Sequence, residues 1–148
     1  MEMNEITAMN NANTLSVGER FDEIRDRKEV WVPKRGETLK DRTEVYNALN
    51  AASENLGNHQ NEKIRVTNLV MRGREVTDKD TGDYKEILEV LLVADDGTIY
   101  RSSSSGIIRS VEGILSVVGG PESWGDGLDM MVRSVPTSKG HTYLLELV

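Results

Sequence analysis

The sequence offers few side chains for catalysis. It contains no cysteine and only two histidines, His59 and His141, which have no acidic residue at a spacing diagnostic of a general base. The absence of cysteine excludes a disulfide framework, a thiolate zinc site and a cysteine nucleophile. Phosphate-loop, dinucleotide-binding, zinc-protease and nucleophile-elbow motifs are absent as well. The sequence therefore predicts a protein that is not an enzyme and that uses no cofactor and no metal ion.

Binding of a nucleic-acid strand needs cations that follow the phosphates and aromatic rings on which bases stack. The whole chain of 148 residues carries a formal charge of −7, but residues 63–109 hold eight basic and eight acidic side chains. A polyanion partner is expected at this neutral segment, because local cation density matters more than total charge. The predicted phosphate contacts are Lys63, Arg65, Arg72, Arg74, Arg101 and Lys139, with Arg133 as a further cation of the same kind.

The dipeptide Asp96-Gly97 predicts a two-residue hairpin turn between a strand over residues 84–94 and a strand over residues 98–103. Two-residue pairing sorts the side chains of this hairpin onto two faces. The uniformly apolar face, which is the expected core, carries Leu88, Val90, Leu92, Ala94 and Ile99. The opposite, outward face carries Glu89, Leu91, Val93, Tyr100 and Ser102.

Tyr100 and Tyr84 are the predicted base-stacking residues. Tyr100 is expected to point outward, and the alternative is a tyrosine that only covers its apolar neighbours. Tyr84 begins its strand beside a polar loop, near Lys79 and Lys85, which suits a platform at the mouth of a groove. Ordinary surface decoration is the alternative for Tyr84. Trp31 is expected either to pack a peripheral strand onto the domain or to contact another subunit.

The predicted elements follow one another as three strands, one helix and two strands. Apolar side chains at every second position predict the strands, and an apolar stripe from Ile107 to Val118, capped by Ser105, predicts the helix. The strands are expected at residues 64–76, 84–94, 98–103, 128–135 and 141–148. A mainly β, five-stranded Greek-key barrel of the OB type has this order, with its helix between strands 3 and 4, although other small α+β folds share it.

An N-terminal extension over residues 1–37 is expected to precede the OB domain over residues 38–148. Residues 1–14 are rich in Asn and Met without an apolar period, which is typical of a disordered segment. Ser16 and Glu19 have the spacing of a capping box and predict a short charged helix to about Lys28. The pattern of residues 38–56 fits either a helix or a strand that leaves through a turn.

The C-terminal part of the chain resembles the single-stranded DNA-binding proteins of tailed bacteriophages, including those of small protein-primed phages. The resemblance spans about residues 42–148. Its motifs, in chain order, are Val45-Tyr46-Asn47-Ala48, the stretch Ala94-Asp95-Asp96-Gly97-Thr98-Ile99-Tyr100-Arg101-Ser102, a Ser-Gly-led helix, Gly119-Gly120-Pro121-Glu122-Ser123-Trp124, Thr137-Ser138-Lys139-Gly140 and the closing Tyr143-Leu144-Leu145-Glu146-Leu147.

The resemblance implies an OB barrel that coats single-stranded DNA without catalysis during phage replication. Tyr100 falls on the tyrosine after the Asp-Gly turn that the protein-primed members use for DNA contact, and Tyr84 falls on one near the preceding loop. The chain lacks the acidic C-terminal tail by which bacterial counterparts recruit partners.

The sequence thus predicts sequence-independent binding of single-stranded DNA, which protects and organises that DNA during phage replication or recombination. The expected location is the cytoplasm of the infected bacterium, because the sequence has neither a signal-peptide start nor an apolar run of about 18–20 residues. Replication proteins are possible further partners. One alternative is an OB-fold protein that binds a host or phage protein through Trp31 and the N-terminal helix. A further alternative, a protein that binds a small ligand or nucleotide, is supported by no motif in the sequence.

Overall fold

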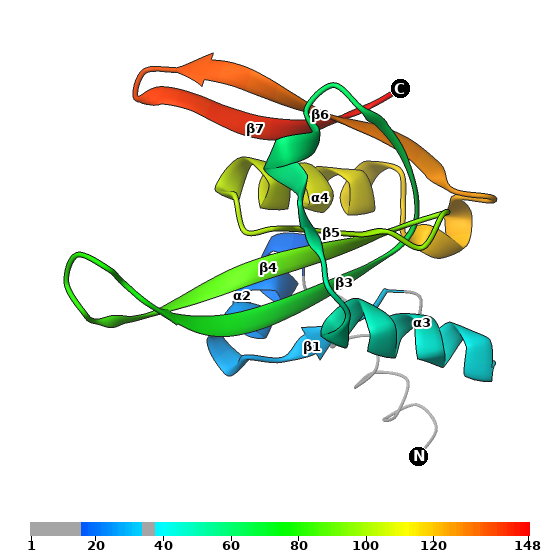
Figure 1. The fold of residues 1–148 in the computed structure, drawn as a ribbon, viewed down its shortest axis with the longest axis horizontal. Coiled ribbons are helices and arrows are strands. Elements are labelled where there is room, and N and C mark those ends of the chain that lie inside the picture. The colour runs from blue at the N-terminus through cyan, green and yellow to red at the C-terminus, as the bar shows by residue number, and fades with distance from the viewer. Residues whose placement is uncertain (1–15, 34–37) are drawn as a thin grey trace.

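The computed structural model describes residues 16–33 and 38–148, so the prediction for residues 1–14 lies outside the described residues. These residues form a mainly β protein, in which one curled mixed sheet makes a half-barrel (Figure 1). Its strands are β1 (Val30–Trp31), β2 (Glu54–Asn55), β3 (Lys63–Thr77), β4 (Tyr84–Ala94), β5 (Ile99–Ser102), β6 (Leu128–Thr137) and β7 (Gly140–Leu147). The helices of the described residues are α2 (Val17–Arg27), α3 (Leu39–Asn50) and α4 (Ser105–Val117), with 3-10 turns η1 (Leu56–His59) and η2 (Pro121–Ser123).

The prediction of five strands and one helix was wrong in number, because the described residues form seven strands and three α-helices. The two extra strands, β1 and β2, have two residues each, which is too short for an alternating pattern to reveal. The predicted succession itself is present as β3, β4, β5, α4, β6 and β7. The strands lie in the order β2-β5-β4-β3-β6-β7, and β1 pairs with β3.

The predicted two-residue turn between β4 and β5 was also wrong. The Ala94 N–H donates to the Thr98 carbonyl at 2.9 Å, which leaves a three-residue loop over 95–97 with Gly97 at φ 88°. The extra loop residue shifts the register by one, so Leu92 rather than Val93 lies opposite Tyr100. Because neighbouring positions of a strand face opposite sides, the shift moves Tyr100 from the expected outward face to the core face.

The inner, concave face of the sheet packs against α2 and α4. From α2, Phe21 and Ile24 are buried in this core, and Trp31 of β1 packs edge-to-face on Phe21 with ring centroids 6.0 Å apart. Trp31 therefore fixes a peripheral strand, which was one of the two expectations for it. The domain boundary near residue 37 stays a prediction, although elements on its N-terminal side contribute to this core. Among the described residues, no helix is both long and apolar enough to cross a membrane.

The outer, convex face of the sheet is covered at its centre by α3, which settles the open alternative for residues 38–56 in favour of a helix over most of that segment. The Thr38 hydroxyl caps α3 by accepting from the Asp41 N–H at 3.1 Å. Ala48 of this helix is buried, and Val45 and Leu49 are partly buried beside it. These three side chains cover four outward side chains of the strands, namely Val70, Leu91, Val93 and Ile99.

Helix α4 lies inside the curl and packs closely on β7 (Figure 1). The Leu145 N–H of β7 donates to the Ser110 hydroxyl of α4 at 3.1 Å, which satisfies an edge group of the last strand. A Cβ on Gly106 would overlap the backbone carbonyl of Tyr143, so only glycine fits there. Gly113 differs, because nothing lies within 4 Å of its Cβ position. Close packing therefore requires glycine at position 106 but not at position 113.

We predict opposite effects for alanine at these two glycines. Gly106→Ala should lower the free energy of unfolding by about 1–3 kcal/mol, because the added methyl group forces α4 away from β7. Gly113→Ala is the matched control in the same helix and should raise it by about 0.5–1 kcal/mol through helix propensity. Urea denaturation followed by circular dichroism measures both changes. Equal stability of the two variants would contradict the close contact between α4 and β7.

Candidate nucleic-acid interface

The strand register places every basic side chain of the described strands on the outer face of the sheet. Each strand position is assigned to a face by alternation from side chains whose core is known. Ile64 and Val90 belong to the inner core, and Val70 and Leu91 belong to the outer core. The outer-face cations are Lys63, Arg65, Arg72, Arg74, Lys85, Arg101 and Arg133. The acidic side chains of the same face are Glu89, Asp129 and Glu146. This face is therefore positive, although the chain is acidic as a whole.

One group of outer-face cations surrounds Asp129 of β6. Arg65 donates from Nε to Oδ1 of Asp129 at 3.0 Å, and Lys63 Nζ lies 3.5 Å from Oδ2. The hydrogen bond from Arg65 is the main reason that the pKa of Asp129 lies below its ordinary value. One carboxylate is thus shared by two cations, and one positive charge remains uncompensated.

A second group surrounds Glu89, whose carboxylate is buried with 4 % exposure. Arg72 Nε donates to Oε1 at 2.7 Å, and Arg74 Nη1 donates to Oε2 at 3.0 Å. Both guanidinium groups compensate the buried charge, since an unpaired carboxylate there would be costly. The side chain of Arg74 stays about half exposed and can also meet a ligand.

Arg72 holds the C-terminal end of α3 on the sheet, and Arg101 holds the segment that follows the helix. Arg72 Nη1 donates to the Leu49 carbonyl at 3.1 Å, and Arg101 Nη1 donates to the carbonyl and hydroxyl of Ser53. The last carbonyls of a helix lack intrahelical partners and carry partial negative charge, so Arg72 suits the Leu49 carbonyl in the last turn of α3. Both arginines therefore have a structural role in addition to their predicted one.

Tyr84 and Lys139 lie away from these groups. Tyr84 is the first residue of β4, at the far end of the projecting β3–β4 hairpin, and is 76 % exposed. Lys139 lies in the turn between β6 and β7. The ends of the two hairpins project from the same side of the molecule (Figure 1). Among the described residues, Lys139 forms no ion pair, and neither do Lys79 and Lys85, which lie near Tyr84 in the chain.

Tyr100 lies on the inner face, opposite the cations. Its ring packs edge-to-face with that of His59, with centroids 5.0 Å apart, and burial is the main reason that its pKa is raised. His59 lies between two carboxylates, with Nε2 3.2 Å from Glu54 Oε1 and Nδ1 3.0 Å from Glu62 Oε2. The structure therefore brings six of the seven predicted cations onto one face but leaves Tyr100 on the other.

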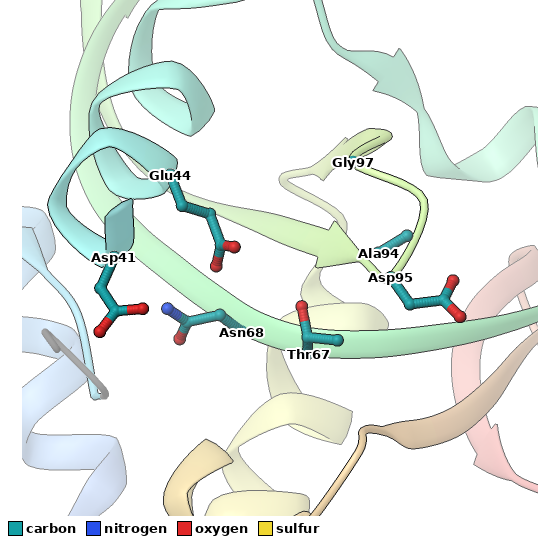
Figure 2. Close-up of a pocket in the computed structure, with 7 residues that line it drawn as sticks. All are labelled: Asp41, Glu44, Thr67, Asn68, Ala94, Asp95 and Gly97. Atoms are coloured by element: carbon teal, nitrogen blue, oxygen red, sulfur yellow. The ribbon is translucent and has the colours of Figure 1, made fainter. Parts of the chain in front are cut away.

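A cavity of about 260 Å³ opens between α3 and the sheet (Figure 2). Asp41 and Glu44 of α3 point toward Thr67 and Asn68, and Asp95 lies on the far side. Three carboxylates and no basic side chain among the lining residues make this cavity unsuitable for phosphate. The described residues also contain no group of His, Cys, Asp or Glu that could hold a metal ion.

The sequence indicates Arg133 as a further cation that could contact phosphate, and it indicates Lys85 only as a neighbour of Tyr84. Both belong to the outer face, and the two-residue alternation of their strands already carries that signal. Arg133 donates to Glu146 Oε2 at 3.1 Å and to Asn61 Oδ1 at 2.8 Å. The outer face therefore holds more cations than the sequence prediction assigned to it.

Comparison with known proteins gives one result for most of the chain. A family model described as phage single-stranded DNA-binding protein matches residues 25–147. Searches of curated proteins and of solved structures find no match. The matched range includes all seven strands of the described residues, and therefore the whole outer face.

We predict that Arg101→Ala loosens the C-terminal end of α3. The variant loses the hydrogen bonds to Ser53, and the backbone amides of residues 47–51 should exchange with deuterium about fivefold faster, as about 1 kcal/mol of lost stabilisation implies. Arg109→Ala, at an exposed position of α4, is the control and should leave these amides unchanged. Unchanged exchange in Arg101→Ala would show that Arg101 does not hold α3.

Proposed function

The chain belongs to the phage single-stranded DNA-binding protein family, and we propose that it binds single-stranded DNA along the outer face of its sheet, without regard to base sequence. The observation that carries this placement is the charge segregation of the strands. All of their basic side chains lie on the outer face, and acidic Glu54, Glu75 and Glu86 lie on the inner face. A phosphate backbone is attracted to the first face and repelled by the second.

The phosphate contacts in this proposal are the predicted cations, and the structure supports them unequally. Lys63, Arg65 and Arg74 are about half exposed, so they can reach a phosphate while still paired with a carboxylate. Arg72 and Arg101 contribute mainly to the positive field, because both already hold α3. Lys139 extends the positive surface to the end of the β6–β7 hairpin.

The stacking residues in this proposal are Tyr84 and Tyr100, and a DNA base would approach them at different places on the sheet. Tyr84 is open to solvent at the end of the β3–β4 hairpin, beside Lys85. Tyr100 is accessible only in part, from the inner side of the sheet beside His59. By the alternation of β4, Tyr84 is on the same side as Glu86, so a strand that follows the outer face would meet its ring only at the end of the hairpin.

The fold supports an OB-type interpretation of the half-barrel. The five longer strands, β3 to β7, pair in the order that a partly open OB barrel uses, with α4 after the third of them. OB folds hold oligonucleotides on the second and third strands and on the two hairpin loops. The equivalent elements here are β4, β5 and the two hairpin ends that project from the same side (Figure 1).

The proposed role is to coat, protect and organise single-stranded DNA during phage replication or recombination, in the cytoplasm of the host and together with replication proteins. Family membership implies that this role is not catalytic. The alternative, a protein that binds a host or phage protein through Trp31 and the N-terminal helix, has less support. Trp31, Phe21 and Ile24 are committed to the inner core.

The proposal predicts tight binding of poly(dT) and weak binding of duplex DNA by the full chain. Affinity should fall steeply with salt, because bound phosphates release their counterions. Titration followed by tyrosine and tryptophan fluorescence, at low and moderate salt, measures both properties. The absence of any response to poly(dT) at low salt would refute the proposal, and equal affinity for the duplex would refute its preference for single strands.

The proposal also predicts opposite effects for the two partners of the Asp129 group. Arg65→Ala should weaken poly(dT) binding and reduce the slope of log affinity against log salt by about 1, because one phosphate contact is lost. Asp129→Asn should strengthen binding severalfold, because Lys63 and Arg65 lose a competing carboxylate. Arg109→Ala, a control outside the strands, should change neither. An unchanged salt slope in Arg65→Ala would remove this group from the DNA path.

A further inference from the structure

Helix α3 covers the part of the sheet that would otherwise offer apolar surface to bases. Four outward side chains, Val70, Leu91, Val93 and Ile99, lie beneath Val45, Ala48 and Leu49 of the helix. All four are nearly inaccessible. A strand that follows the outer face therefore meets α3, and not the centre of the sheet.

The helix lies between the cationic groups of the outer face. Its N-terminal half adjoins Thr67 and Asp95, and the Asp95 N–H donates to the Arg65 carbonyl at 2.9 Å. Its C-terminal end is held by Arg72, and Arg101 holds Ser53 just beyond it. A polyanion that spans these groups must therefore pass along or across α3.

The side of α3 that points away from the sheet carries an exposed aromatic ring. Tyr46 is 66 % exposed, and Arg42, one helical turn before it, is exposed too. Asp41 and Glu44, in contrast, point toward Asn68 and Thr67 on the sheet (Figure 2). The outward side near Tyr46 therefore combines a cation with an open ring, whereas these two carboxylates are turned away from it.

We propose that Tyr46 is a base-stacking residue and that α3 is the platform on which the strand passes between the cationic groups. This inference rests on the proposed function and adds a binding residue to it. The ring stacks on a base, and Arg42 contacts a neighbouring phosphate. Because every base has a π face, such a contact requires no particular base sequence.

The test is a poly(dT) titration of the full chain at two salt concentrations. Tyr46→Ala should weaken binding about tenfold or more without changing the salt slope, because it removes a ring and no charge. Tyr46→Phe keeps the ring and should bind within about twofold of the parent. Asn47→Ala, at the next exposed position of α3, is the matched control and should bind like the parent.

Binding by Tyr46→Ala as tight as that of the parent and the control would overturn the inference and leave the proposed function intact. Failure of the parent itself to bind poly(dT) would refute the proposed function instead. Thermal unfolding and the amide exchange of α3 in Tyr46→Ala separate a lost contact from a displaced helix. Tyr46→Trp adds an independent readout, because the emission of an indole that stacks on bases should be quenched on titration, and unchanged emission would also overturn the inference.

Discussion

The organisation of this protein depends on one constraint, which is that the centre of the sheet is apolar on both faces. Met71 and Val90 point inward while Val70 and Leu91 point outward, and all four are buried. A sheet of this kind is stable in water only if both faces are covered. Helices α2 and α4 cover the inner face, and α3 covers the outer one.

The need to cover the outer face also explains the arrangement of charge around it. α3 contributes few buried side chains, so its attachment relies on polar contacts at and just beyond its end, where Arg72 donates to the Leu49 carbonyl and Arg101 to the Ser53 carbonyl. Arg72 also compensates the buried Glu89. Two of the predicted phosphate contacts thus also stabilise the fold. An arginine on this face can donate to a backbone carbonyl and still contribute to the positive potential of the face.

The sequence was sufficient for the long strands and for α4, since their apolar side chains recur with clear periods of two and of about 3.6. It was insufficient for the side on which Tyr100 lies, because one additional loop residue at Asp95 reverses every assignment in β5. The common outer position of Lys63, Arg65 and Arg74 did not follow from alternation, because a bulge between Val66 and Asn68 shifts the alternation of β3 by one residue. The sequence also did not predict that α3 covers the outer face. Few apolar residues of α3 face the sheet, and a local pattern does not tell which surface they contact.

The charge pattern also bears on how an acidic chain can select one orientation of a polyanion. Three acidic side chains of the strands, Glu54, Glu75 and Glu86, lie on the inner face, where no phosphate is expected. Their repulsion of phosphate disfavours an approach to the inner face, so part of the negative charge adds specificity. Asp129 and Glu89 lie among the cations themselves, where each fixes two long side chains in place. These carboxylates neutralise part of the positive charge, but they also order the basic side chains before a ligand binds. This order lowers the conformational entropy lost on binding.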